Sequence, residues 1–162
     1  MPGFDDTMES APKPSTGCES APELAQTRGP WRILIVDDEE PVRNLLARML
    51  KESELDCEMR TAGNGFAACA AIRESKPHLI VLDVVMPELD GAELCRVLRN
   101  SEESAGIRVL LISGYGFDDS LVQDAIASGA AGFIAKPVSQ WELVAKVSAL
   151  LRGGRLRRRS MR

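Results

Sequence analysis

The sequence predicts an α/β fold: a doubly wound parallel sheet of five strands with helices on both faces. Two observations predict it. Five short predicted strands, most of them apolar runs bounded by polar or turn residues, alternate strictly along the chain with segments whose apolar residues recur at helical spacing. Parallel strands need a long crossover connection, so strict alternation favours a parallel sheet whose crossover helices cover both faces.

The first half of the body is expected to hold three strands and two helices. Residues 33–36 form a continuous apolar run that stops at an acidic cluster, which is typical of a strand buried on both faces. Pro41 suits the first turn of the following helix, whose apolar residues recur at helical spacing up to Leu50. The remaining elements are a short strand at 57–61, a helix at 64–75 and an apolar strand at 79–82 that ends at Asp83.

The second half is expected to add two strands and three helices. A helix at 91–100 precedes an apolar strand at 109–112. Asp118 or Asp119 can then cap a helix that Gly129 closes, because glycine readily adopts the left-handed conformation that ends helices. The last strand, at 131–135, leads to a helix that begins with a capping box from Ser139 to Glu142, and Gly153 and Gly154 are expected to end the domain.

Length and composition indicate one soluble domain. The 162 residues, 44% hydrophobic and 27% charged, can bury a core without disulfides. No apolar run approaches the roughly 20 residues of a membrane-spanning helix, and the N-terminus lacks the basic and apolar stretches of a secretory signal. We therefore expect a cytoplasmic protein without membrane insertion. Four scattered cysteines and one histidine predict neither a disulfide framework nor a zinc site.

Composition divides the chain into three regions. Residues 1–30 are rich in Pro, Ser, Gly and Ala with few large apolar side chains, which predicts a disordered tail. Residues 31–152 form the acidic folded body, and residues 153–162 form a basic tail that carries arginines and no acid. Such a tail can bind nucleic acid, an anionic membrane surface or an acidic partner. It has no interleaved aromatic residue, so we favour a solvated tail or a linker stub over a DNA-binding element.

Polar residues stand at the ends of four of the predicted strands. Asp37 and Asp38 follow the first strand, Asp83 the third, Ser113 the fourth and Lys136 the fifth. In a doubly wound sheet, ligands bind in the crevice beyond the carboxyl ends of the strands. Residues far apart in the sequence are therefore expected to meet at one edge of the sheet.

Their chemistry favours phosphoryl transfer. Three crowded carboxylates repel one another, and a hard divalent cation such as Mg²⁺ stabilises them in ionised form. A carboxylate can attack phosphorus and form an acyl phosphate. Asp83 stands alone after the central strand and is the candidate nucleophile, which leaves Asp37 and Asp38 to hold the metal. Lys136 can contact the phosphate as a compact charge, and Ser113 can do so through its hydroxyl.

Residues 31–152 resemble the receiver domains of two-component response regulators, in the superfamily of the chemotaxis regulators. The motifs that carry the resemblance are Ile-Leu-Ile-Val-Asp-Asp-Glu at 33–39, Leu-Ile-Val-Leu-Asp-Val-Val-Met-Pro-Glu-Leu-Asp-Gly at 79–91, Leu-Ile-Ser-Gly at 111–114 and Phe-Ile-Ala-Lys-Pro at 133–137. They occur in the family's order and at spacing like the family's, which makes the combined signal highly specific.

The resemblance implies a flavodoxin-like fold with strand order 2-1-3-4-5. It also implies that Asp38, Asp83 and the backbone carbonyl of Val85 coordinate Mg²⁺, while Asp37 reaches the ion mainly through water. Asp83 would be the phosphorylation site. The phosphoryl group would come from the phosphohistidine of a histidine kinase or a histidine phosphotransfer protein.

The resemblance further implies a switch. Phosphorylation would draw the Ser113 hydroxyl toward the phosphate, and Phe133 would turn inward behind it. The surface formed by the fourth helix, fifth strand and fifth helix, at 118–151, would then change and contact an output partner or a second copy of the chain. The peptide bond before Pro137 is expected to be cis. Core packing without switching remains an alternative for Phe133.

Two positions depart from the family's commoner pattern, and a third is one at which the family varies. Ser113 replaces threonine, and Phe133 replaces tyrosine, so the ring at that position cannot hydrogen-bond. Tyr115 occupies a position at which family members differ in how long the phosphoryl group lasts. Its bulk can shield Asp83 from water, which predicts slow autodephosphorylation.

Other functions fit less well. Haloacid-dehalogenase phosphatases use an acid two residues after the nucleophile, where this chain has Val85. No glycine-rich nucleotide-binding motif follows the first strand, and a pseudo-receiver would lack one of the acids or the lysine. We therefore expect a signalling receiver rather than an enzyme. A stand-alone receiver is favoured, and the alternative is a fragment of a longer DNA-binding regulator or hybrid kinase.

Overall fold

The computed structural model describes residues 29–88 and 90–157, with side chains described up to residue 152. Most of the predicted N-terminal tail and residues 158–162 of the predicted basic tail lie outside the described residues. Within the described part, five strands and five helices alternate along the chain, as the sequence predicts.

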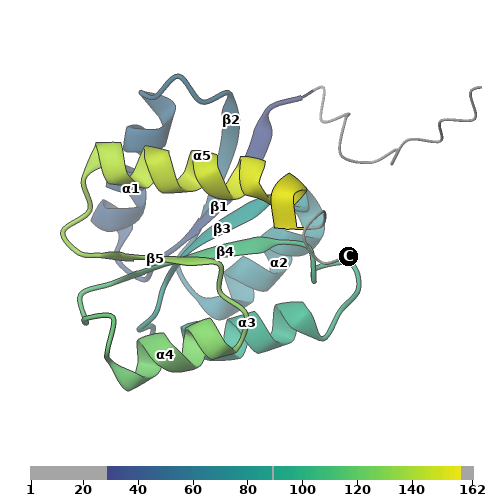
Figure 1. Ribbon diagram of the computed structural model, residues 1–162, viewed down its shortest axis with the longest axis vertical. Coiled ribbons are helices and arrows are strands. Elements are labelled where there is room, and N and C mark those ends of the chain that lie inside the picture. Colours follow the sequence, from purple (N-terminus) through teal and green to yellow (C-terminus); the bar gives the residue numbers. More distant parts are fainter. Residues whose placement is uncertain (1–28, 89, 158–162) are drawn as a thin grey trace, which may run out of the picture.

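The five strands form one parallel sheet in the order β2-β1-β3-β4-β5 (Figure 1). This confirms the doubly wound α/β class and the strand order that the resemblance implies. The strands are β1 (Trp31–Val36), β2 (Cys57–Ala62), β3 (Leu79–Asp83), β4 (Arg108–Ser113) and β5 (Gly132–Ala135). The helices are α1 (Glu40–Lys51), α2 (Gly65–Ser75), α3 (Gly91–Arg99), α4 (Ser120–Ala127) and α5 (Gln140–Arg157).

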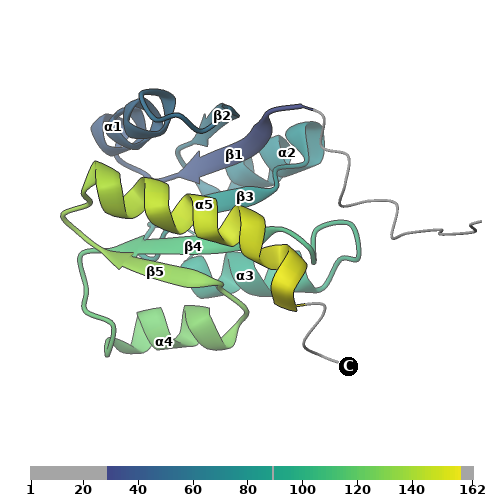
Figure 2. The same cartoon turned by 45° about the horizontal axis from the view of Figure 1, so that its top comes forward.

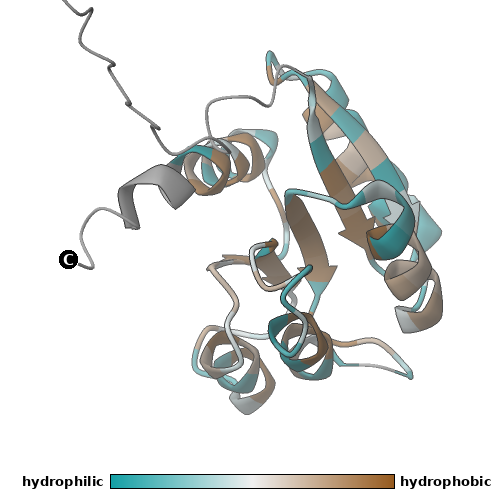
Figure 3. Cartoon of the chain, turned by 90° about the vertical axis from the view of Figure 1, so that its right-hand side faces the viewer, coloured by the Kyte–Doolittle hydropathy of each residue, from teal (hydrophilic) through white to brown (hydrophobic). Residues whose placement is uncertain are grey.

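Each face of the sheet has its own apolar core. Successive side chains of a strand point to opposite faces, so Leu34 and Leu82 pack with α2, α3 and α4, whereas Ile35 and Val81 pack with α1 and α5. Figure 2 shows α5 crossing one face of the sheet with α3 beyond the other. In Figure 3 the strands are brown over most of their length and the helices alternate between brown and teal. The central strands β1, β3 and β4 are therefore buried on both sides over most of their length, whereas β2 and β5, at the sheet edges, are only partly buried.

Side chains at the helix ends satisfy backbone donors and acceptors. Asp119, rather than Asp118, caps α4 by accepting a hydrogen bond from the Leu121 N–H. After α4, Gly129 has a φ of 112°, a conformation that side-chain-bearing residues rarely adopt. The Arg99 guanidinium from α3 donates to the Gly129 carbonyl and occupies the space that a Cβ would need there. Gly129 therefore closes α4, as the sequence predicts.

The last helix runs past the two glycines that were expected to end the domain. α5 continues past Gly153 and Gly154 and ends at Arg157. A glycine inside a helix costs only about 1 kcal/mol relative to alanine, so two glycines do not stop a helix by themselves. The residues that follow them are mostly arginine and leucine, which are good helix formers.

The chain's one histidine links β1 to β3. The His78 N–H donates to the Arg32 carbonyl (2.8 Å), and His78 Nδ1 accepts from the Arg32 N–H (3.0 Å). Nδ1 must therefore be unprotonated. Burial, together with the nearby charges of Arg32 and Arg108, lowers the pKa of His78. These contacts give His78 a structural role.

Protonation of His78 is expected to destabilise the fold. Because the pKa of His78 is lower in the folded chain, the unfolded chain takes up a proton first, and stability falls as the pH drops through the ordinary value of about 6.5. The urea concentration at the unfolding midpoint of the wild type should decrease as the pH is lowered from about 7.5 to about 5.5. His78→Asn keeps an acceptor for the Arg32 N–H and should show a flatter profile over this range. Parallel profiles for the two proteins would contradict the assignment.

Candidate functional site

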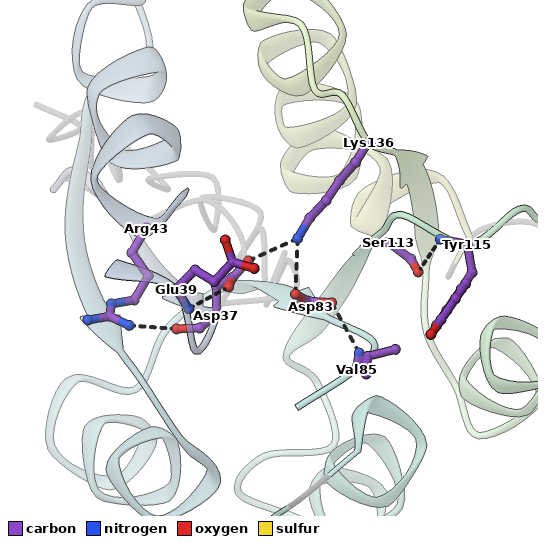
Figure 4. A network of polar contacts seen from close by, with 8 residues as sticks. All are labelled: Asp37, Glu39, Arg43, Asp83, Val85, Ser113, Tyr115 and Lys136. Atoms are coloured by element: carbon purple, nitrogen blue, oxygen red, sulfur yellow. Dashed lines mark hydrogen bonds and ion pairs between the residues drawn. The ribbon is translucent and has the colours of Figure 1, made fainter. Parts of the chain in front are cut away.

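Four strand ends bring the predicted polar residues together at one edge of the sheet. In the parallel register, Val36 pairs with Leu82, Asp83 with Ile112 and Ser113 with Ala135, so β1, β3, β4 and β5 end side by side. The polar residues stand at or directly after those ends (Figure 4). They are Asp37, Asp38, Asp83, Ser113 and Lys136.

The three aspartates form an acidic cluster in which one carboxylate oxygen from each lies within 4.8 Å of the other two. Asp37 and Asp83 are buried, with 1% and 8% of their surface exposed, whereas Asp38 is exposed. A set of converging carboxylate oxygens with one open side is the donor chemistry that Mg²⁺ prefers. The residues present therefore fit the cation that the resemblance implies.

Asp37 is held by four contacts. Its N–H donates to the Ala62 carbonyl (3.2 Å), its own carbonyl accepts from Arg43 Nη1 (2.7 Å), and Oδ1 accepts from the Glu39 N–H (2.9 Å). Oδ2 lies 3.4 Å from Lys136 Nζ. These contacts fix both the backbone and the carboxylate of Asp37.

Lys136 joins the first and third strands electrostatically. Its Nζ lies 3.1 Å from Asp83 Oδ2 in addition to its contact with Asp37. Burial alone would lower the pKa of Lys136, but hydrogen bonds and charge from Asp83 and Asp37 outweigh that effect and raise it. The ammonium is therefore charged at neutral pH and offsets part of the repulsion between the two carboxylates.

Ser113 is fully buried at the end of β4. Its Oγ accepts a hydrogen bond from the Tyr115 N–H at 3.0 Å. This contact uses a lone pair of the hydroxyl and leaves the hydroxyl proton free to be donated elsewhere. On the neighbouring strand, Asp83 Oδ1 accepts from the Val85 N–H at 3.1 Å, which orients the carboxylate (Figure 4).

The two predicted switch residues lie beside β4 and β5. Phe133 is half-buried and meets the Phe117 ring edge-on, with ring centroids 5.9 Å apart. Its backbone carbonyl accepts from Lys146 Nζ (2.8 Å). Tyr115 is 49% exposed. The inward turn of Phe133 on phosphorylation stays a prediction.

One predicted feature and one missed residue remain. The Lys136-Pro137 peptide bond is cis, as the resemblance implies. Sequence reasoning did not single out Arg43, whose guanidinium holds the Asp37 carbonyl. The signal available for Arg43 was a basic residue within the first turns of a helix, where the helix dipole favours acids.

In the part of the chain that the structure describes, no helix is both long and apolar enough to cross a bilayer.

Comparison with known proteins gives a consistent result. The family model described as response regulator receiver domain matches residues 33–148. The phosphate regulon transcriptional regulatory protein PhoB of Pseudomonas aeruginosa is 39% identical over 120 residues, which cover 74% of this chain and 51% of that protein. The alkaline phosphatase synthesis transcriptional regulatory protein PhoP of Bacillus subtilis is 40% identical over 121 residues, covering 75% and 48%. The chain thus spans about half the length of these relatives.

Solved structures agree with the sequence matches. The signal receiver domain of the response regulator NarL from Mycobacterium tuberculosis has a TM-score of 0.68 at 31% identity, covering 77% of this chain and 98% of that one. The signal receiver domain of a histidine kinase from Syntrophus aciditrophicus has a TM-score of 0.68 at 33% identity, covering 76% and 91%.

Removing the Lys136 charge should destabilise the metal-free protein. Lys136→Gln leaves Asp37 and Asp83 without their shared cation. Breaking a fully buried ion pair costs roughly 3–5 kcal/mol, but the Lys136 side chain is 27% exposed, so we expect a smaller loss of about 1–3 kcal/mol. Urea unfolding in the presence of EDTA measures it. The control Lys51→Gln removes an exposed charge from α1 and should change stability little, and an equally small effect at Lys136 would contradict the account.

Proposed function

The chain belongs to the response regulator receiver domain family, and on that premise we propose that Asp83 accepts a phosphoryl group from the phosphohistidine of a histidine kinase or histidine phosphotransfer protein. The observation that carries this proposal is the contact of Lys136 Nζ with Asp83 at 3.1 Å and with Asp37 at 3.4 Å. This contact brings together the proposed nucleophile Asp83, the Lys136 ammonium and Asp37, a proposed metal-binding acid, at one edge of the sheet.

In the proposed transfer, an Asp83 carboxylate oxygen attacks phosphorus while the bond from phosphorus to the donor imidazole nitrogen breaks. The electron pair of that bond stays on the imidazole, and an acyl phosphate forms on Asp83. Mg²⁺, held by Asp38, Asp83 and the Val85 carbonyl and reached by Asp37 through water, would neutralise charge on the transferring group. The Lys136 ammonium provides a second positive charge beside Asp83.

Ser113 is proposed to sense the phosphoryl group on Asp83. Its hydroxyl proton is free in the unphosphorylated protein because the Tyr115 N–H occupies an acceptor position on Oγ. Donating that proton to the phosphoryl group would pull on β4 and the loop that follows it. Phe133, at the start of β5, would then leave its contact with Phe117 and turn inward.

We place the output surface at residues 118–151, on α4, β5 and α5. The partner there would be an output protein, an attached output domain or a second copy of the chain. Relatives about twice as long are consistent with an attached domain. The stand-alone receiver expected from the sequence and its cytoplasmic location stay predictions. So does the preference for a solvated tail or linker stub over nucleic-acid binding by the basic tail. In this role the chain is a signalling module that assists only its own phosphorylation and dephosphorylation.

Phosphorylation can be tested directly by intact-mass measurement. Incubation with acetyl phosphate and Mg²⁺ should add one phosphoryl group to the wild type and none to Asp83→Asn, because an amide cannot form the acyl phosphate. Asp124→Asn, an exposed acid on α4, serves as the matched control and should be phosphorylated normally. An adduct that persists in Asp83→Asn, or no adduct in the wild type with Mg²⁺ present, would overturn the proposal.

The lifetime of the acyl phosphate tests the role proposed for Tyr115. If the bulk of the ring shields Asp83 from water, Tyr115→Ala should lose the phosphoryl group about tenfold faster, the rate change for roughly 1.4 kcal/mol of barrier. Tyr115→Phe keeps the ring and should retain the wild-type lifetime. Decay followed by phosphate release measures both, and equal lifetimes for wild type and Tyr115→Ala would exclude shielding.

A further inference from the structure

Arg43, on α1, makes a contact that the proposed chemistry does not use. Its Nη1 donates to the backbone carbonyl of Asp37 at 2.7 Å, the short distance typical of a charged donor. Among the described residues, no acid pairs with the Arg43 side chain. A half-buried guanidinium thus holds a neutral carbonyl at the end of β1 (Figure 4).

The same guanidinium lies against the end of β2. A Cβ added to Gly63 would meet Arg43 Nη1 at 3.0 Å and Cζ at 3.4 Å. The Asp37 N–H meanwhile donates to the carbonyl of Ala62, the residue before Gly63. Arg43 therefore clamps the segment after β1 onto the end of β2, and the absence of a side chain at Gly63 makes room for it.

Asp38 depends on this clamp more than the other two acids do. Asp37 and Asp83 each have contacts that fix their carboxylates, whereas the Asp38 carboxylate is exposed and has no hydrogen-bond partner among the described residues. Its position then follows from its backbone. The Asp37 carbonyl that Arg43 holds belongs to the peptide group that joins Asp37 to Asp38.

We infer that Arg43 is a positioning residue for the metal site: by holding the Asp37 carbonyl against Gly63, it keeps the Asp38 carboxylate within reach of Asp37 and Asp83. This inference rests on the proposed function, in which these acids bind Mg²⁺. It gives a role to a residue outside the acidic cluster itself.

Charge and position make opposite predictions for Arg43. A positive charge near a divalent cation repels it, so if charge alone mattered, removing Arg43 would tighten Mg²⁺ binding. If Arg43 positions Asp38, removing Arg43 leaves the Asp38 carboxylate less well ordered and weakens Mg²⁺ binding. Loss of a group that orients a metal ligand typically costs about 10–100-fold in affinity. The direction of the change therefore separates the two effects.

The experiment measures Mg²⁺ affinity of the full chain by calorimetry, with Mn²⁺ binding followed by electron paramagnetic resonance as a second readout. Arg43→Gln should bind about tenfold more weakly, at the lower end of the range for such losses. Arg43→Lys keeps the charge but loses the forked guanidinium, and should lie between wild type and Arg43→Gln. Arg48→Gln removes the same charge from an exposed position on α1 and should match the wild type. Unchanged or tighter binding in Arg43→Gln would overturn the inference.

Gly63→Ala tests the clamp without touching Arg43 itself. The added Cβ forces the guanidinium to move by a few tenths of an ångström. Gly63→Ala alone should therefore weaken Mg²⁺ binding relative to the wild type, whereas adding Gly63→Ala to Arg43→Gln should weaken it no further. Additive losses would contradict the clamp.

Urea unfolding and the Mg²⁺ affinity of the wild type separate the ways in which these experiments can fail. Urea unfolding in EDTA reports stability alone, and a merely structural Arg43 would lower the urea midpoint without changing the affinity. A wild type that binds no Mg²⁺ would defeat the proposed metal site, whereas a binding wild type with an equally binding Arg43→Gln defeats only the role of Arg43.

Discussion

The repulsion between three carboxylates at the end of the sheet is the constraint on which the rest of the site depends. Asp37, Asp38 and Asp83 place oxygens within 4.8 Å of one another, and two of these side chains are almost fully buried. Like charges this close favour neutralisation by protons, by a lysine or by a cation. Lys136 supplies one positive charge, and hydrogen bonds from the Glu39 and Val85 N–H groups supply further stabilisation. The remaining negative charge suits a divalent cation and, through it, an anionic phosphoryl group.

The fold keeps this unfavourable arrangement in place. β1 and β3 are buried on both faces, so neither strand end can move apart without disturbing two apolar cores. Parallel pairing sets β4 and β5 beside them in register, which brings Ser113 and Lys136 to the same edge. The site therefore lies where β1, β3, β4 and β5 end, and each functional side chain stands at or shortly after the end of its strand.

That relation explains what could be predicted from the sequence. Apolar runs ending in Asp, Ser or Lys mark strand ends directly, so the sheet and its polar edge were both accessible to pattern reasoning. The end of α5 was not, because two glycines cost too little to stop a helix. Arg43 and Gly63 were also missed, since Arg43 on α1 holds the backbone carbonyl of Asp37 beside Gly63, and such a contact leaves no periodic signal. The choice of Asp119 over Asp118 as cap likewise depends on local backbone geometry.

In the proposed function, four strand ends surround one phosphoryl position on Asp83. A crystal structure of the chain with Mg²⁺ and beryllofluoride, a mimic of the phosphoryl group, tests it most directly. The account predicts beryllofluoride bonded to an Asp83 carboxylate oxygen, Mg²⁺ on Asp38 and Asp83, and the Ser113 hydroxyl and Lys136 ammonium within hydrogen-bonding distance of the fluorides. Beryllofluoride bound to another residue, or Asp83 left bare in a structure that holds Mg²⁺, would contradict it.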